Sequence, residues 1–321
     1  MALGMMVNGK WTTEWTERDT TGEFNRMPTQ FRQWITADGS SGFKAEAGRY
    51  HLYVSLACPW AHRTVILRSL KGLQNQIGLS IVDPILTEKG WGFSDRPGAI
   101  PDTVNGARYL QDIYLQARPD YTGRITVPVL WDKQTQTIVN NESREIVRML
   151  DREFAAFARP DSDFCPEPLR DLIDQTIDAI YRPINNGVYR SGFATSQTAY
   201  EEAVTELFEH LDRWEEILGH QRYLCGAQLT EADVNLFTTL IRFDLVYHGH
   251  FKCNLRRIVD YPNLWNYLKD LYQHPAIKPT CNFDHIKCHY YMSQTQVNPT
   301  GIVPKGPLID FDEPHDRHRF G

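Results

Sequence analysis

The sequence predicts a mixed α/β domain that is followed by a domain built almost entirely from helices. Between residues 50 and 86, a segment with the alternation of a strand passes into helical spacing and then into a second strand. Two short strands and a helix follow between residues 126 and 150, and from about residue 165 the apolar residues recur mainly at helical spacing. Strands confined to one part of the chain indicate two domains with separate cores.

The composition is that of a soluble globular protein, with 321 residues, 41% hydrophobic and 23% charged. The net charge of -6 argues against a nucleic-acid-binding protein, because such proteins usually carry a basic domain. No apolar segment approaches the ~20 residues that span a membrane, and the N-terminus lacks the features of a signal peptide. Six cysteines are too few for a disulfide scaffold in a chain this long. We therefore expect reduced thiols and a cytoplasmic location.

The α/β domain begins after a polar, turn-rich extension. We expect this extension, residues 1–45, either to wrap the domain that follows or to be a loosely ordered arm. Apolar residues alternate over 50–56, which predicts a strand. Pro59 then indicates the start of a helix, since proline is favoured at the first helical position. A second strand at 79–86 should lie parallel to the first, through a right-handed crossover.

The second half of this domain starts beyond an inserted loop, residues 87–123, which is rich in Gly, Pro and Asp. Short strands at 126–131 and 137–139 should pair as a hairpin, and a helix should begin at Glu142. The order strand–helix–strand, then strand–strand–helix, is typical of a thioredoxin-like domain. We place this domain at residues 46–152.

The rest of the chain predicts an all-α domain at residues 165–321, with an irregular tail from about residue 295. A long helix near 198–219 should bury one face, formed by Ala203, Leu207, Leu211, Trp214 and Leu218. Another helix should begin after Thr230, because Asp233 stands three residues later in a variant of the capping box.

Cys58 lies between the first strand and the helix that Pro59 begins. Unpaired N–H groups and the positive end of the helix dipole favour a thiolate there, and the thiolate is the nucleophilic form of cysteine. A free cysteine is more commonly a small, buried and inert residue. The position of Cys58 favours the reactive interpretation.

Two further features of the α/β domain are consistent with a reactive thiol. Pro128 interrupts an apolar strand, either because the strand is at an edge or because a cis bond turns the Val127 backbone toward an extended peptide. Glu142 and Ser143 open the next helix, where serine would be a cap or the helix start would bind a carboxylate. Together with Cys58, these features predict a glutathione site.

Four segments resemble those of the cytosolic glutathione transferases: CPWAHR, VPVLWD, NNESREI and LTEADVNLF are similar to their thiol, cis-proline, γ-glutamyl-binding and helix-capping segments. CPWAH, GWGF and RFDLVYHGHFKCN together resemble the glutathionyl-hydroquinone reductases, the Xi class, although CPWAH alone would also suit an omega-type transferase. The resemblance extends over nearly the whole chain. It implies the glutathione transferase fold, glutathione as co-substrate and a homodimer. From the charge, the lack of a long apolar segment and the spacing of the possible ligands, we expect no nucleic-acid partner, no membrane and no metal.

The resemblance also implies roles for individual residues, with Cys58 as the nucleophile. The residues implied to bind glutathione are Trp91, Arg124, Val127, Pro128, Glu142 and Ser143. Tyr189 and Tyr290 fall where the family binds the quinol, and Tyr291 adjoins the second of these positions.

The implied reaction starts from a glutathionyl-hydroquinone, whose glutathione sulfur Cys58 attacks. The hydroquinone leaves, and a second glutathione resolves the mixed disulfide and releases oxidised glutathione. Ala61 stands where a CxxC motif would have its second cysteine, which favours this reaction over that of a dithiol reductase.

A zinc site is one alternative, since soft ligands recur in the C-terminal part of the chain: His248, His250, Cys253, Cys281, His285, Cys288 and His289. In a helix over 281–289, Cys281, His285 and Cys288 would share one face. Paired CxxC or HExxH spacing is missing, which favours packing roles, and we expect Cys165 and Cys225 to be unreactive as well.

Two other functions remain open. An omega-like glutathione-dependent thiol transferase or dehydroascorbate reductase would use the same cysteine, and a glutathione-binding interaction module would use none. Cys58 in an activating position argues against the interaction module. His62, one turn into the helix, should be a surface or interdomain residue and not a base for Cys58.

Overall fold

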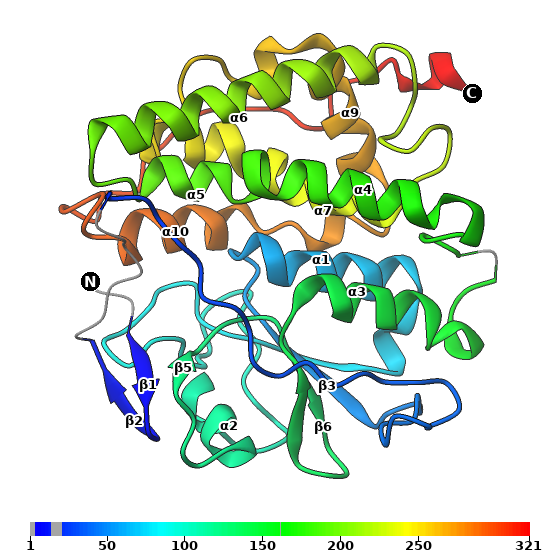
Figure 1. Cartoon of the computed structure of the whole chain (residues 1–321), viewed down its shortest axis with the longest axis vertical. Helices are drawn as coiled ribbons and strands as arrows, with labels where there is room; N and C mark the ends of the chain where they lie inside the picture. Colours follow the sequence, from blue (N-terminus) through cyan, green and yellow to red (C-terminus); the bar gives the residue numbers. More distant parts are fainter. Residues whose placement is uncertain (1–3, 14–20, 161) are drawn as a thin grey trace. The chain divides into compact units, whose positions relative to one another are not determined.

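The structure is a computed structural model that describes residues 4–13, 21–160 and 162–321 (Figure 1). Its contacts divide the chain into two compact units, each made of three segments. The first unit combines Met1–Thr16, Met27–Ser162 and Thr280–Gly301. The second combines Glu17–Arg26, Asp163–Pro279 and Ile302–Gly321. The sequence-based boundaries at 46–152 and 165–321 stay predictions beside this division.

A four-stranded mixed sheet with the order β4-β3-β6-β7 forms the centre of the first unit. β3 pairs in parallel with β4, as the crossover predicts, and in antiparallel fashion with β6, which pairs with β7. All five residues of β3 are buried. The strands are β3 (Tyr50–Val54), β4 (Gly78–Ile81), β6 (Val129–Asp132) and β7 (Thr137–Asn140). This arrangement confirms the thioredoxin-like α/β architecture.

Two helices lie side by side on one face of this sheet and pack against each other, α1 (Pro59–Leu70) and α3 (Ser143–Arg152) (Figure 1). Pro59 is the first residue of α1, as predicted. A third helix, α2 (Leu110–Ala117), lies within the inserted loop and packs against β7. The fourth helix of the unit, α10 (Phe283–Ser293), comes from the far end of the chain.

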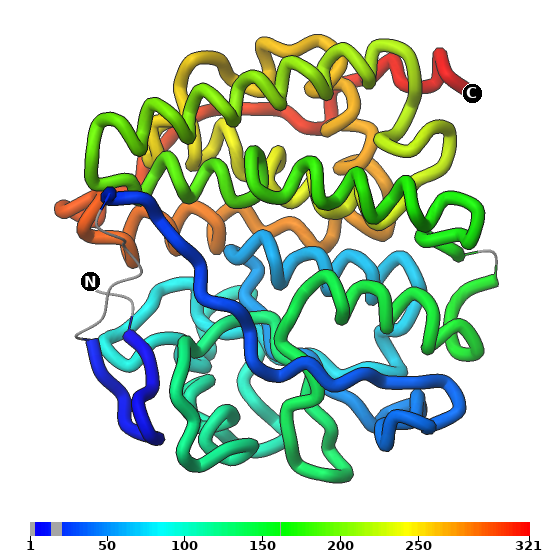
Figure 2. Tube along the Cα trace, viewed as in Figure 1, coloured from blue at the N-terminus to red at the C-terminus, as the bar shows by residue number. Residues whose placement is uncertain are grey.

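The N-terminal segment contributes strands to the first unit. β1 (Met5–Val7) lies between β2 (Lys10–Thr12) and β5 (Gly123–Arg124) in a small antiparallel sheet. Farther along, Arg32 pairs with Asn140 in an antiparallel bridge, so residues 31–33 extend the edge of the central sheet beyond β7 (Figure 2). Between residues 27 and 45 the extension is therefore packed against the α/β domain and is not a loose arm.

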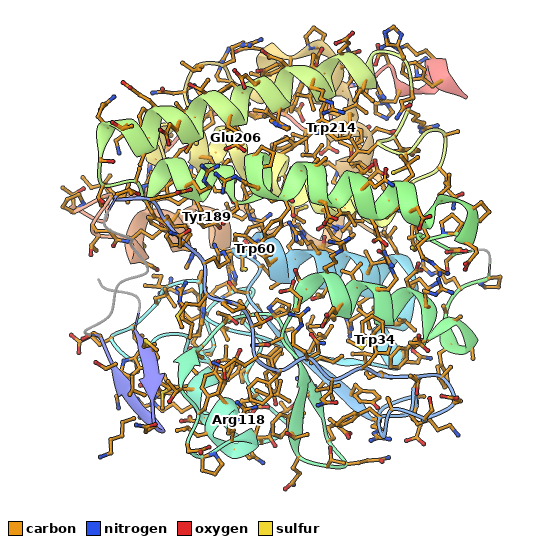
Figure 3. All side chains as sticks on the ribbon, in the orientation of Figure 1. Trp34, Trp60, Arg118, Tyr189, Glu206 and Trp214 are labelled. Carbon is orange, nitrogen blue, oxygen red and sulfur yellow. The ribbon has the colours of Figure 1, made fainter. Side chains whose placement is uncertain are left out.

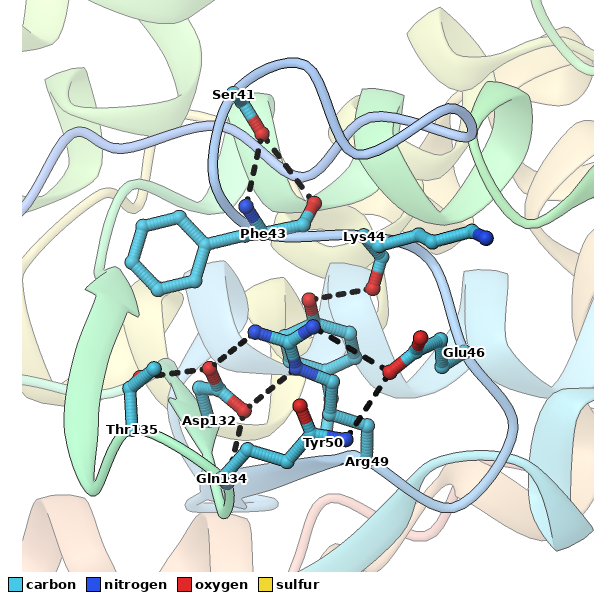
Figure 4. A network of polar contacts seen from close by, with 9 residues as sticks. All are labelled: Ser41, Phe43, Lys44, Glu46, Arg49, Tyr50, Asp132, Gln134 and Thr135. Carbon is cyan, nitrogen blue, oxygen red and sulfur yellow. Dashed lines mark hydrogen bonds and ion pairs between the residues drawn. The ribbon is translucent and has the colours of Figure 1, made fainter.

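A buried ion pair fastens the start of β3 to the end of β6 (Figure 4). Arg49 donates two hydrogen bonds to Asp132, at 2.9 and 2.7 Å, and their side chains are 7% and 0% exposed. Asp132 also accepts hydrogen bonds from Thr135 and from the Gln134 backbone. Burial alone would raise the pKa of Asp132, but the hydrogen bonds from Arg49 and Thr135 lower it below its ordinary value. The carboxylate is thus fully satisfied.

The second unit is helical, as predicted. Its longer helices are α4 (Arg170–Ile180), α6 (Gln197–Leu218), α7 (Glu231–Arg242) and α9 (Pro262–Gln273). Two π-helical turns, Tyr181–Asn185 and Phe243–Tyr247, lead into the short helices α5 (Gly187–Gly192) and α8 (His248–His250). The tail forms a 3-10 turn at Arg317–Phe320.

Two local predictions for this unit are confirmed. The five apolar residues predicted to share one face of α6 are all buried, Trp214 among them (Figure 3). Thr230 and Asp233 form the capping box at the start of α7, where the Asp233 carboxylate accepts hydrogen bonds from the Thr230 backbone and hydroxyl. Within the described residues, no helix combines the length and apolar character needed to cross a membrane.

Candidate active site

Cys58 occupies the N-cap position of α1. Its backbone is extended, and its carbonyl accepts the first hydrogen bond of the helix, from the His62 N–H at 3.0 Å. The side chain is half-buried. The sulfur therefore sits at the positive end of a 12-residue helix with access to solvent, the setting that favours a thiolate.

The Cys58 sulfur lies 3.7 Å from the carbonyl oxygen of Val127. The peptide bond between Val127 and Pro128 is cis, as one of the two sequence interpretations predicted. The edge-strand interpretation of Pro128 is wrong, because this residue precedes β6, which lies between two other strands. Thiol and cis-proline thus meet at one end of the central sheet.

Glu142 and Ser143 are at the start of α3, but Glu142 is the cap and Ser143 is the first helical residue. The Glu142 carboxylate accepts hydrogen bonds from the Arg144 N–H at 3.3 Å and the Ser143 hydroxyl at 3.5 Å. It also accepts one from the hydroxyl of Thr29, in the N-terminal extension, at 3.3 Å. The Glu142 N–H donates to the Asn140 side chain at 2.7 Å.

Tyr114, which the sequence did not single out, connects two of these segments. Its hydroxyl donates to the Thr126 carbonyl at 2.8 Å and accepts from the Asn141 amide at 3.1 Å. These partners directly precede Val127 and Glu142. Burial raises the pKa of Tyr114, so the phenol stays protonated at neutral pH. No local pattern indicates this role, because the partners are 12 and 27 residues away.

Arg124 forms part of β5, which pairs with β1, and its carbonyl accepts a hydrogen bond from the Tyr121 hydroxyl at 3.0 Å. It is half-buried and stands three residues before Val127 in the chain.

Trp91 lies in the inserted loop and stacks on His289 of α10, with ring centroids 4.9 Å apart and planes 18° apart. His289 also contacts the ring of its neighbour Tyr290 edge-on, and its Nδ1 lies 2.8 Å from the Pro84 carbonyl oxygen. Tyr290 is fully buried, whereas Tyr291 is half-buried. Trp91 and Tyr290, far apart in the sequence, are therefore joined through His289, which the sequence interpretation assigned only to packing or a metal.

Tyr189 belongs to the second unit, in α5, where it is labelled in Figure 3. It is 7% exposed and contacts the rings of Phe193, Tyr247 and Phe251. The guanidinium of Arg26 lies 5.3 Å from its ring centroid. The predicted quinol residues Tyr189 and Tyr290 thus come from different compact units.

The remaining cysteines lie in other surroundings. None of the six, all of which the structure describes, forms a disulfide. Burial raises the pKa of Cys253 to about 12 and also raises the pKa values of Cys225 and Cys288, which favours the inert thiol form.

The zinc interpretation finds no matching cluster. Among the residues that the structure describes, no group of three or more His, Cys, Asp or Glu side chains could hold a metal ion. Cys281 precedes the first residue of α10, Phe283, so it does not share a helical face with His285 and Cys288. A surface position for His62 is also wrong, since this residue is fully buried and its Nε2 lies 2.8 Å from the Thr280 hydroxyl.

Comparisons with known sequences identify the family to which this fold and site belong. The profile of the glutathione S-transferase N-terminal domain matches residues 57–153, and that of the C-terminal domain matches residues 197–270. Glutathionyl-hydroquinone reductase YqjG of Escherichia coli is 53% identical, over 99% of this chain and 100% of its own. Glutathionyl-hydroquinone reductase PcpF of Sphingobium chlorophenolicum is 49% identical, over 95% and 96%.

Solved structures give the same result. A Xi-class glutathione transferase from Natrialba magadii matches with a TM-score of 0.94 and 52% identity, over 99% of this chain and 97% of its own. The glutathione-bound structure of YqjG from Escherichia coli matches with a TM-score of 0.91 and 52% identity, over 98% and 99%. The chain belongs to the glutathione S-transferase family and, within it, to the Xi class.

Proposed function

We propose that the protein is a glutathionyl-hydroquinone reductase, which uses glutathione to convert glutathionyl-hydroquinones to hydroquinones. The observation that carries the proposal is the position of Cys58, a half-buried thiol at a helix start and 3.7 Å from the carbonyl before the cis-proline. Ala61 provides no second thiol, so glutathione must resolve the intermediate. The names of the relatives from Escherichia coli and Sphingobium chlorophenolicum support this activity.

The roles of the other residues follow the same proposal. Glutathione binds as co-substrate, with its backbone along Val127 and its γ-glutamyl group at the start of α3, near Glu142 and Ser143. Trp91, Arg124 and Pro128 complete the glutathione site. Tyr189 and Tyr290 bind the quinol. The glutathione-bound structure of the Escherichia coli relative supports the choice of co-substrate.

The proposed reaction consists of two successive attacks by a thiolate on a sulfur atom. The Cys58 thiolate attacks the sulfur of the glutathionyl-hydroquinone, forming an S–S bond while the bond between sulfur and ring carbon breaks. The electron pair of the broken bond goes to the ring carbon, which takes up one proton from water or from a nearby tyrosine hydroxyl. The thiolate of a second glutathione then attacks the mixed disulfide, so that oxidised glutathione leaves and the Cys58 thiolate is restored.

The direct experiment combines purified protein, glutathione and glutathionyl-menadiol. We expect release of menadiol with one equivalent of oxidised glutathione, and mass spectrometry should find glutathione on Cys58 when the second glutathione is withheld. Cys58→Ser should show neither result, whereas Cys288→Ser, a matched change of a half-buried cysteine, should show both. Failure of the wild-type protein to release menadiol would disprove the proposal.

An omega-like thiol transferase or dehydroascorbate reductase is the second candidate. Its support is a relative from Schizosaccharomyces pombe, named glutathione S-transferase omega-like 2, which is 46% identical over 92% of this chain. A substitution at Tyr290 should distinguish the two functions. Tyr290→Phe should slow the release of menadiol but leave the exchange of a small disulfide with glutathione unchanged, because only the first reaction involves a quinol.

We also propose that the protein is a cytoplasmic homodimer that binds no metal. Light scattering of the purified protein tests the dimer, and its expected mass is twice that of the chain. Elemental analysis for zinc in metal-free buffers should give far less than one equivalent per chain.

A further inference from the structure

Residues 21–26, here called the N-terminal strap, belong to the second unit and lie against the turn between its helices α5 and α6. The carbonyl of Gly22 accepts a hydrogen bond from the Thr195 N–H at 3.1 Å, and the carbonyl of Thr21 accepts one from the Ser196 hydroxyl at 2.9 Å. Gly22 has a φ of 86°, and a Cβ there would come within 2.7 Å of the Thr195 hydroxyl oxygen. Glycine is therefore required for this close approach.

A group of charged side chains holds the strap at its next residue. Glu23 accepts a hydrogen bond at 3.0 Å from Arg190, whose side chain is only 4% exposed. Arg190 also donates to Glu206 at 2.5 Å, and Arg182 lies within 4 Å of both Glu23 and Glu206. Figure 3 labels Glu206 and Tyr189 in this unit. Because Arg190 is buried, its two carboxylate partners should be costly to remove.

The last residue of the strap, Arg26, lies over the ring of Tyr189, which we propose to bind the quinol. Phe24 is buried against Phe193, with ring centroids 5.2 Å apart. The guanidinium of Arg26 lies 5.4 Å from the Phe24 ring centroid and 5.3 Å from that of Tyr189. Its Nε donates to the Asn186 side chain at 3.4 Å. The cation is thus held near Tyr189 by an aromatic neighbour and by a residue of the same helical segment.

A cation over a phenol ring has two effects on that phenol. It draws electron density from the ring, which makes the hydroxyl a stronger hydrogen-bond donor to an oxygen that gains negative charge. A planar guanidinium also restricts the tilt of the ring that it covers.

We propose that Arg26 is a positioning residue for Tyr189 and, through it, sets which hydroquinones react well. The inference rests on the proposed function. When the bond between sulfur and ring carbon breaks, its electron pair enters the quinol ring and negative charge builds on the ring oxygens. The Tyr189 hydroxyl donates to one of these oxygens. Electron-rich hydroquinones, which hold that charge poorly, therefore depend most on Arg26.

The test compares Arg26→Met, which removes the charge and keeps an apolar side chain, with Arg26→Lys, which keeps the charge and loses the planar group. We expect Arg26→Met to lower kcat for glutathionyl-menadiol about five-fold, the effect of one cation–π contact on a rate. KM for glutathione should not change. The loss should be larger for methoxy-substituted hydroquinones than for chlorinated ones, and Arg26→Lys should lie between Arg26→Met and the wild type.

Two controls make the result specific to Tyr189. Arg256→Met removes a similar cation, 4.7 Å from the Tyr261 ring in the same unit, and should leave the kinetics unchanged. In a protein that already carries Tyr189→Phe, Arg26→Met should cause no further loss of kcat.

Three results would overturn the inference: unchanged kcat in Arg26→Met, an equal loss with all hydroquinones, or a full additional loss in the Tyr189→Phe protein. Each of these requires an active wild-type protein. An inactive wild-type protein would overturn the proposed function and this inference with it, so the two failures are distinguishable.

Discussion

The two ends of the β3–β6 strand pair have opposite characters. At one end, Arg49 and Asp132 are buried and their charges satisfy each other through two hydrogen bonds. At the other end, Cys58 is half-buried at a helix start and its sulfur lies 3.7 Å from the Val127 carbonyl oxygen. The strand pair is thus held by a buried ion pair at one end and has a half-buried thiol beside a backbone carbonyl at the other. We therefore expect substitutions at the two ends to change stability and activity separately.

The largest expected effect is on activity, from Cys58→Ser. Without the thiolate we expect turnover of glutathionyl-menadiol to fall by at least about 10³-fold. Serine is a preferred N-cap residue, so the free energy of unfolding should be unchanged or higher by up to about 1 kcal/mol. Steady-state kinetics and urea denaturation measure the two quantities. Turnover within ten-fold of the wild type would show that the reactive group is elsewhere.

At the opposite end of the strand pair, Asp132→Asn should lower the stability and leave the activity nearly unchanged, the reverse of the result expected for Cys58→Ser. Removing the carboxylate leaves the buried Arg49 with only the more exposed Glu46, 3.4 Å away, as a counter-charge, which should lower the free energy of unfolding by about 3 kcal/mol. Turnover per folded molecule should stay within two-fold of the wild type at low temperature.

Asp312→Asn is the matched control for this prediction, because its partner Lys278 is 45% exposed and Asp312 is 56% exposed. The loss of this exposed pair should cost less than about 1 kcal/mol. Similar losses in the two variants would contradict the distinction between a buried and an exposed ion pair.

Tyr114→Phe should affect stability and substrate binding together, because Tyr114 connects the segments that precede Val127 and Glu142. Its loss leaves the Thr126 carbonyl and the Asn141 amide without a partner, at a cost of about 1–3 kcal/mol. We expect a higher KM for glutathione with a smaller change in kcat.

Tyr200→Phe provides the control for Tyr114→Phe. It removes a single hydroxyl bond to the Lys252 carbonyl and should cost less than about 1 kcal/mol without a change in KM. An unchanged KM in Tyr114→Phe would show that the two segments keep their places without the tyrosine.

The smallest expected effect is a pH dependence of stability. The pKa of Asp132 is lower in the folded protein than in the unfolded chain, where it is about 3.9. The stabilisation is therefore complete above about pH 4 and is lost as the pH falls through the lower, folded-state pKa. Urea denaturation between pH 6 and pH 2 should show this loss, and part of it should be absent in Asp132→Asn. Parallel curves for the two proteins would assign the acid sensitivity to other carboxylates.

Features that depend on neighbours in the chain were predictable from the sequence. The alternation before Cys58, the proline after it and the spacing of Thr230 and Asp233 predict strand, helix start and cap, and all three are confirmed. Pro128 was interpretable because a proline in an apolar strand has few physical explanations, and a cis bond is one of them.

Features that depend on distant contacts were not predictable in this way. The stack of Trp91 on His289 joins residues almost 200 positions apart, and neither has a local pattern that indicates the other. The burial of His62 likewise depends on Thr280. From the sequence alone, a histidine in either position is consistent with metal binding, packing or surface exposure. Only the partners that folding places beside it distinguish these roles.

The segments of the two compact units alternate along the chain, which limits how the units can be separated by proteolysis or truncation. Each unit consists of three separate segments, and the last segment of the first unit is residues 280–301. A fragment that stops at residue 162 would lack α10, and with it His289 and Tyr290. No single cleavage point or gene truncation can therefore isolate either unit whole, and during synthesis the first unit cannot be completed until almost the entire chain has left the ribosome.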